Sequence, residues 1–123
     1  MTPRSIPLAR PNITQAEIDA VVAVLQTPHL SLGPKVPEFE SDFAQFCGTR
    51  HAIACANGTT GLHLIVRAMG IGEGDEVITT PFSFVASANC VLMEGAKPVF
   101  VDSETNTWNI DPRRIEAAVT PRT

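Results

Sequence analysis

The residues best suited to chemistry lie in the segment Asn57-Gly58-Thr59-Thr60, which follows an apolar run over 52–56. Small and apolar residues without polar alternation are typical of a strand that is buried on both faces in a parallel sheet. Apolar residues at helical spacing follow the segment, so we expect a helix to begin directly after the strand. The start of such a helix presents free backbone N–H groups and the positive end of the helix dipole. The segment therefore predicts an anion site, and phosphate is the usual ligand.

Gly58, Thr59 and Thr60 are each suited to binding a phosphate. Gly58 has no Cβ, so it can adopt a positive φ and allow close approach to the backbone. Thr59 and Thr60 can offer amide and hydroxyl donors. Three alternatives compete: a hairpin, which should be followed by a second strand rather than a helix; a nucleic-acid-clamping G-x-x-G loop, which joins two helices; and a strand-to-helix turn that binds nothing. The dinucleotide fingerprint and the phosphate-binding P-loop motif are both absent from the sequence.

Length and composition fit one domain with an ordinary core, since 44% of the 123 residues are hydrophobic and 18% are charged. The net charge of −4 disfavours nucleic acid and anionic membranes as partners. No apolar run approaches the length of a membrane span, and no leader is recognisable, so the cytoplasm is the default location. Three cysteines without a C-x-x-C pattern indicate neither a disulfide framework nor a structural zinc site, and we predict no metal.

The elements before the segment are an arm and two helices. Residues 1–12 contain three prolines and no periodicity, so we expect an extended arm. Thr14 and Glu17 form a capping box for a helix that ends near Gln26. After a connection over 27–34, a second helix carries phenylalanines that we interpret as core: Phe39, Phe43 and Phe46.

The elements after the segment alternate between strand and helix. The first helix ends at Gly70, in the left-handed conformation that favours glycine. There follow a turn over 72–75, a strand over 76–80, a helix from an N-cap at Ser83 to about Glu94, a strand over 98–101, and a helix from Asp111-Pro112 to about Val119. This order predicts an α/β layered fold with right-handed crossovers. The chain ends where another strand should begin, so we expect it to be the front part of a longer protein.

Seven ordered motifs add a family resemblance to this interpretation. They are Ile6–Pro11, Gly33–Glu40, Asn57–Leu64, Gly70–Thr79, Phe84–Asn89, Gly95–Asp102 and Asn109–Pro112. With these motifs in the family's spacing, the chain resembles the sugar-nucleotide aminotransferases of the DegT/StrS type, which are pyridoxal-phosphate (PLP) enzymes of fold type I. The resemblance implies a three-layer αβα fold, with residues 1–123 as the N-terminal part of the PLP-binding large domain.

The resemblance also implies roles for particular residues. The turn of Gly58, Thr59 and Thr60 would hold the cofactor phosphate through backbone amides. Phe84 would stack on the pyridine ring, although it and Phe82 could each belong to the core. The resemblance places Ser31 and Gly33 near the substrate. Thr60-Gly61 stands where relatives commonly have two alanines, a difference that should not disturb amide donation.

The catalytic groups of the family are expected beyond Thr123. These are the Schiff-base lysine and the aspartate that pairs with the pyridine nitrogen, and neither Lys35 nor Lys97 matches the lysine position. Residues 1–123 alone are therefore expected to be inactive and to bind PLP weakly. The family pattern also separates the first strand from the second and third, which pair with each other. Unpaired, apolar strand edges should result.

The function implied by the resemblance is transfer of an amino group from an amino acid, glutamate in most relatives, to a nucleotide-linked ketosugar. The full-length protein would act as a homodimer. One alternative on the same fold is a PLP- or PMP-dependent sugar dehydratase, in which a histidine replaces the lysine. Another is a non-catalytic binding or regulatory module.

Overall fold

The computed structural model describes residues 6–123, which form two compact units that divide after Ala54. Each unit is described by itself. No helix among these residues is both long enough and apolar enough to cross a membrane.

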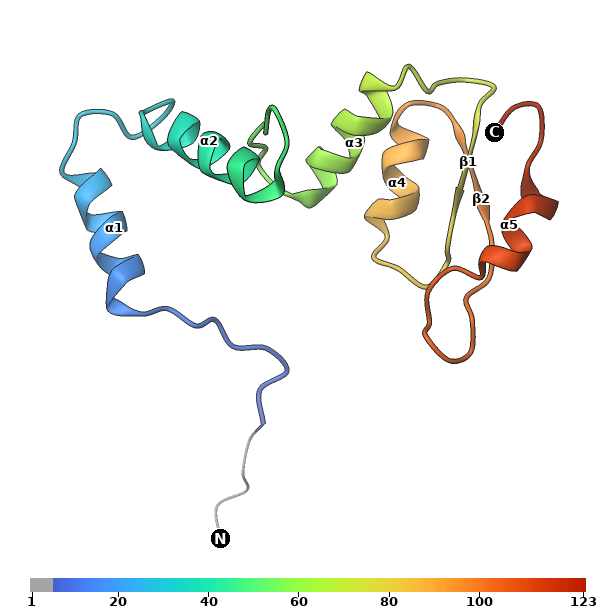
Figure 1. The fold of residues 1–123 in the computed structure, drawn as a ribbon, viewed down its shortest axis with the longest axis horizontal. Helices are drawn as coiled ribbons and strands as arrows, with labels where there is room; N and C mark the ends of the chain where they lie inside the picture. The colour runs from blue at the N-terminus through green and yellow to red at the C-terminus, as the bar shows by residue number, and fades with distance from the viewer. Residues whose placement is uncertain (1–5) are drawn as a thin grey trace, which may run out of the picture. The chain divides into compact units, whose positions relative to one another are not determined.

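The first unit contains two helices, α1 (Gln15–Leu25) and α2 (Lys35–Cys47) (Figure 1). The Thr14 side chain accepts a hydrogen bond from the Ala16 N–H, and Glu17 Oε2 accepts one from the Thr14 N–H at 2.6 Å, so the predicted capping box is confirmed. α2 ends at Gly48, whose φ of 66° is left-handed. Of the predicted extended arm, residues 1–5 lie outside the described residues, and residues 6–12 form neither helix nor strand.

The second unit contains α3 (Gly58–Ala68), β1 (Glu76–Thr79), α4 (Ala86–Met93), β2 (Lys97–Phe100) and α5 (Pro112–Ala118). The two strands pair in parallel, with Glu76 opposite Lys97 and Thr79 opposite Phe100. Figure 1 shows α4 and α5 on opposite sides of the strands, as expected of an αβα arrangement. Asp111 caps α5 by accepting a hydrogen bond from the Arg113 N–H, and Pro112 is the first helical residue, as predicted.

The core of the second unit is small and lies where α3 packs on α4. Val66, Cys90, Val91 and Ala96 are buried there, and Ile71 and Val77 pack against them. Gly70 (φ 73°) ends the α3 segment in the left-handed conformation that the sequence predicted. The core thus fixes α3 relative to α4, and these helices flank the site described below.

The predicted buried strand over 52–56 is wrong. No strand forms there, and Ile53 is 81% exposed. A strand needs a hydrogen-bonding neighbour, and the only strands among the described residues, β1 and β2, pair with each other. The second and third predicted strands pair with each other, as the family pattern predicted.

The interpretation of the α2 phenylalanines as core is also wrong. Phe39, Phe43 and Phe46 are exposed, Phe46 by 88%, and they contact one another at ring-centroid distances of 5.7 and 6.5 Å. Helical spacing places these rings on one face, but burial requires a second surface against that face. The described part of the first unit does not supply one.

Two local predictions differ as well. Gly58 does not adopt a positive φ, because it is already the first residue of α3. Ser83 does not cap α4. The N-cap residue is Val85, without a side-chain cap, and the Ser83 hydroxyl instead lies 2.8 Å from that of Ser87.

Candidate functional site

The beginning of α3 is organised by Asn57. Its backbone is extended, and its Oδ1 accepts hydrogen bonds from the Thr60 N–H (2.9 Å) and the Thr60 hydroxyl (3.1 Å). Asparagine is among the preferred residues at this position because its side chain satisfies one of the unpaired donors of the first turn. Both donors of Thr60 are therefore used inside the protein.

Two donors remain at this helix terminus. Among residues 6–123, neither the Gly58 N–H nor the Thr59 N–H has a hydrogen-bond acceptor. The space beside Gly58 is open, since a Cβ built there would meet no atom within 4 Å apart from its chain neighbours and the backbone of its own helix. An anion can thus reach two free amides and the positive end of the helix dipole at one point.

A hollow of about 670 Å³ opens at these amides. It is lined by Asn57, Gly58, Thr59, Leu62, Ile65, Phe84, Ala86 and Ser87. The structure therefore brings Gly58, Thr59 and Phe84 together, although Phe84 comes from the loop between β1 and α4. The Phe84 side chain is 76% exposed. Its ring is thus available to a ligand.

The walls of the hollow are neutral. Leu62, Ile65 and Ala86 are apolar, and no charged side chain is among the lining residues. Attraction for an anion must come from the free amides and the helix dipole, which together contribute up to about 2 kcal/mol. An arrangement of this kind suits a molecule with a phosphate at one end and a flat, apolar ring at the other.

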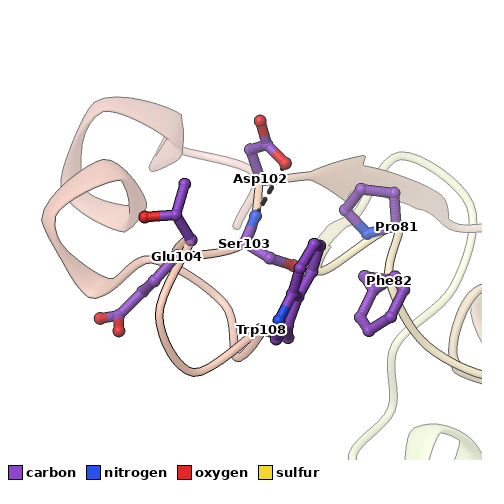
Figure 2. A pocket seen from close by; sticks show the side chains of 7 residues that line it. Pro81, Phe82, Asp102, Ser103, Glu104 and Trp108 are labelled. Atoms are coloured by element: carbon purple, nitrogen blue, oxygen red, sulfur yellow. Dashed lines mark hydrogen bonds between the residues drawn. The ribbon is translucent and has the colours of Figure 1, made fainter.

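The other phenylalanine of the loop takes a different direction. Phe82 packs on Trp108, with the ring centroids 5.1 Å apart and the planes at 41°. Figure 2 shows this pair at the edge of a second hollow of about 370 Å³, beside Pro81 and the segment Asp102–Thr105. The loop thus presents Phe84 to the α3 hollow and Phe82 to Trp108.

Thr60, Ser31 and Gly33 do not line the α3 hollow. Thr60 lies next to it, but its N–H and its hydroxyl both donate to Asn57 Oδ1. Ser31 and Gly33 lie in the first unit, in the connection between α1 and α2. Gly33 approaches the His29 carbonyl so closely that a Cβ would lie 2.6 Å from that oxygen. The roles of all three toward cofactor or substrate stay predictions.

Sequence reasoning missed several lining residues. The sequence favours a turn at Asn57-Gly58, and the strong preference of asparagine for helix N-caps is the signal that identifies the role of Asn57. Leu62 and Ile65 occur at helical spacing, which is equally typical of core residues. Ser87 carried no signal, because only the fold brings the first turn of α4 beside the start of α3.

The lysines of the chain lie elsewhere. Lys35 pairs with Glu38 at 2.6 Å, and Lys97 pairs with Glu76 at 3.1 Å. Neither lines the α3 hollow. Among residues 6–123, no group of three or more histidine, cysteine, aspartate or glutamate side chains could hold a metal ion.

Comparison with known proteins identifies the class. Residues 11–123 match the DegT/DnrJ/EryC1/StrS aminotransferase family, and the chain belongs to this family. The chain has part of the fold of the large domain of fold-type-I PLP enzymes, and PLP is the cofactor of the family.

Individual relatives are similar over nearly the whole chain. The chain is 50% identical over 118 residues to the spore coat polysaccharide biosynthesis protein SpsC of Bacillus subtilis, covering 96% of this chain and 30% of that protein. It is 49% identical over 119 residues to the GDP-perosamine synthase of Caulobacter vibrioides, covering 96% and 32%. The chain thus spans about a third of the length of these relatives.

Solved structures agree. The aminotransferase from Psychrobacter cryohalolentis superposes with a TM-score of 0.89 at 42% identity, over 95% of this chain and 30% of that one. The E. coli GDP-4-keto-6-deoxy-D-mannose-3-dehydratase with bound hydrated PLP superposes with a TM-score of 0.89 at 29% identity, over 97% and 32%. Aminotransferases and a dehydratase therefore share this fold.

Proposed function

We propose that the protein containing this chain is a PLP-dependent aminotransferase that moves an amino group from an amino acid to a nucleotide-linked ketosugar. Residues 1–123 form the N-terminal part of its PLP-binding large domain and supply the phosphate half of the cofactor site. One observation carries the proposal: the free amides of Gly58 and Thr59 and the exposed ring of Phe84 line the same hollow.

The residues present fit this cofactor. The space beside Gly58 admits a phosphate oxygen because Gly58 has no Cβ and no atom from outside its own helix and chain neighbours fills the space. The Gly58 and Thr59 N–H groups would donate to the phosphate, and Asn57 keeps them aligned by capping the helix through Thr60. Thr60 thus supports the phosphate site through the cap. Phe84 would pack on the flat face of the pyridine ring.

The remaining residues of the hollow limit the access of water to the ligand. Leu62, Ile65 and Ala86 form an apolar wall that keeps water from one side of the ligand. When bound, PLP supplies an aldehyde that takes up the donor's amino group and a ring that withdraws electrons from the reacting carbon. The contribution of residues 1–123 is to bind and orient this group.

The energy available here is limited. A helix N-terminus contributes up to about 2 kcal/mol to an anion, and one aromatic contact contributes about 1 kcal/mol. Micromolar affinity requires about 8 kcal/mol. Most of the binding energy must therefore come from residues outside 1–123, including the catalytic lysine that the family resemblance places there.

The same resemblance supports the remaining parts of the proposal. A nucleotide-linked ketosugar and an amino-acid donor are the substrates, and Ser31 and Gly33 lie near the sugar. The protein acts as a homodimer in the cytoplasm. The GDP-perosamine synthase among the relatives favours a nucleotide-linked sugar over a free one.

A sugar dehydratase is the second candidate, because a dehydratase with bound PLP shares the fold at a TM-score of 0.89. The residue at the lysine position of the complete gene separates the two reactions. An aminotransferase has lysine there, and borohydride treatment of the full-length protein should then leave the cofactor covalently attached to that lysine. A dehydratase has histidine and gives no such adduct.

The phosphate site is tested by two substitutions at Asn57 in the full-length protein. Asn57→Asp and Asn57→Ser both keep a side chain that caps helices well. Only the aspartate places a negative charge beside the proposed phosphate, at a cost of about 1–2 kcal/mol.

We expect PLP affinity to fall by about tenfold in Asn57→Asp and to change little in Asn57→Ser. Spectrophotometric titration of the apoprotein with PLP measures both. Equal affinities for the two variants, at equal thermal stability, would exclude a phosphate at this helix terminus.

A further inference from the structure

We propose that Trp108 is a positioning residue for the cofactor. Its contact with Phe82 fixes the loop between β1 and α4, and this loop presents Phe84 to the α3 hollow. The inference rests on the proposed function, because the proposed function places Phe84 against the cofactor ring.

The loop over 80–85 forms neither strand nor helix. Its end is joined to α4, because the Phe84 carbonyl accepts a hydrogen bond from the Ser87 N–H at 3.0 Å. Side chains also hold the loop at both ends. The Thr80 hydroxyl lies 2.9 Å from that of Ser103 and accepts a hydrogen bond from the Phe82 N–H at 3.3 Å. At the other end, the Ser83 hydroxyl lies 2.8 Å from that of Ser87, in α4.

The contact between Phe82 and Trp108 lies between these two anchors. The ring centroids are 5.1 Å apart, although the side chains remain 63% and 61% exposed. Figure 2 shows the two rings side by side, with Trp108 carried by the segment that follows Asp102. This contact therefore does not belong to a buried core. Its consequence is to hold Phe82, two residues before Phe84.

Trp108 is itself held in an unusual conformation. Its φ of 60° is left-handed, which is uncommon for a residue with a large side chain. A closed turn maintains it: the Trp108 N–H donates to the Glu104 carbonyl at 3.1 Å, and the Glu104 N–H donates to the Asn109 carbonyl at 2.9 Å.

The turn is fixed at its base. Ser103 and Ile110 form an antiparallel bridge, and the Asp111 N–H donates to the Asp102 carbonyl at 2.9 Å. Strained residues of this kind persist where the surrounding structure over-determines them, often near functional sites. The turn thus presents the Trp108 ring to Phe82 from a rigid support.

The test is a double-mutant cycle in the full-length protein, with Trp108→Leu and Phe84→Leu singly and together. Titration with PLP gives the affinity, and the visible circular dichroism of the bound cofactor reports how its ring is oriented. Each single substitution should weaken PLP affinity by about three- to tenfold. Trp108→Leu should also change the dichroism per bound cofactor.

The decisive comparison is the double variant. If Trp108 acts through Phe84, adding Trp108→Leu to Phe84→Leu should weaken binding no further. Additive losses, or an unchanged affinity and dichroism in Trp108→Leu, would overturn the inference. If Phe84→Leu weakens binding and Trp108→Leu does not, the proposed function stands and only the inference fails. If neither substitution changes binding, Phe84 is not at the cofactor, and both the inference and the role assigned to Phe84 in the proposed function are wrong.

Further variants separate positioning from folding. Trp108→Phe keeps an aromatic pair and should restore most of the affinity and the dichroism. Phe43→Leu breaks an aromatic pair in α2, with centroids 5.7 Å apart, and should leave both readings unchanged. Should Trp108→Leu fail to fold, Phe82→Leu removes the other ring, and the same cycle with Phe84→Leu decides the question.

Discussion

Glu76 and Arg122, 46 residues apart in the sequence, are joined by two hydrogen bonds. The Glu76 N–H donates to the Arg122 carbonyl at 2.8 Å, and Arg122 Nη2 donates to Glu76 Oε1 at 2.8 Å. The buried Glu76 carboxylate also accepts hydrogen bonds from the Thr120 hydroxyl (2.7 Å) and from Lys97 Nζ (3.1 Å). The start of β1 is therefore tied to β2 and to the end of the chain by one side chain.

Stability should fall in acid because of this carboxylate. The Thr120 hydrogen bond, with further contributions from Lys97 and Arg122, lowers the pKa of Glu76. A lowered folded-state pKa adds stability above the unfolded value of about 4.3. That stability is lost as the pH falls through the lower folded value. Glu76→Gln should therefore be less stable than wild type at neutral pH, and the difference should shrink in acid.

Urea denaturation of the full-length protein between about pH 3 and about pH 7 measures this effect. Glu73→Gln is the matched control, because Glu73 is exposed and has no ion pair among residues 6–123. Its midpoint should follow wild type at every pH. A constant difference between Glu76→Gln and wild type across the range would contradict a role for the charge.

The parts of the fold that depend on near neighbours were predictable from the sequence. The capping box of Thr14 and Glu17, the end of α2 at Gly48 and the start of α5 at Asp111-Pro112 follow from residues within one turn. The strand over 52–56 and the burial of the α2 phenylalanines depend on partners distant in the sequence. Periodicity marks the face of an element but not the surface that covers it.

In the candidate site, too, some residues could be predicted from their near neighbours and others could not. Gly58 and Thr59 could be predicted because a helix start following an apolar run presents free amides. The role of Thr60 could not be predicted, because Asn57 accepts hydrogen bonds from both of its donors. A sequence motif does not show which donors are already used within the protein. The family resemblance favoured Phe84 over Phe82, although either could belong to the core, and the structure separates them: Phe84 lines the α3 hollow, whereas Phe82 packs on Trp108.

Gly58→Ala should separate stability from cofactor binding. A Cβ at this position meets no atom within 4 Å apart from its chain neighbours and the backbone of its own helix, so the fold should be unaffected or stabilised by up to about 1 kcal/mol. The methyl group would instead occupy the space beside the free amides and weaken PLP binding. Thermal unfolding and PLP titration of the full-length variant measure the two effects.

Gly61→Ala is the matched control in the same helix. Its Cβ would lie 3.2 Å from Cys55 Sγ, but Gly61 does not line the hollow. PLP affinity should therefore remain at the wild-type level after a small shift of the thiol. Equal losses of affinity in both variants would indicate a general effect on α3 rather than a phosphate at Gly58.

Alanine substitutions at Gly33 and at Ser31 should have different effects on the free energy of unfolding. At Gly33 a Cβ would lie 2.6 Å from the His29 carbonyl oxygen, so the backbone must shift, at a cost of about 1–3 kcal/mol. Ser31 is exposed, so Ser31→Ala should not change the free energy of unfolding. If Ser31 contacts the sugar substrate, its variant should raise KM in steady-state assays. Wild-type kinetics for Ser31→Ala would remove this residue from the substrate site.

Residues 1–123 expressed alone should not behave as a cooperatively folded monomer. β1 and β2 form a sheet of two strands, and many large apolar side chains, including Ile53 and Phe46, lie exposed. Unpaired strand edges and uncovered apolar faces favour association. Sedimentation should show oligomers or aggregates, and thermal unfolding should be broad.

The full-length protein is the control for this last experiment, because we expect residues outside 1–123 to cover the apolar side chains that the isolated chain exposes. It should sediment as a defined oligomer and unfold in a cooperative transition. A soluble, cooperatively unfolding monomer of residues 1–123 would show instead that the small core of Val66, Cys90, Val91 and Ala96 is sufficient for folding. In that case the phosphate half-site could be titrated with PLP in isolation.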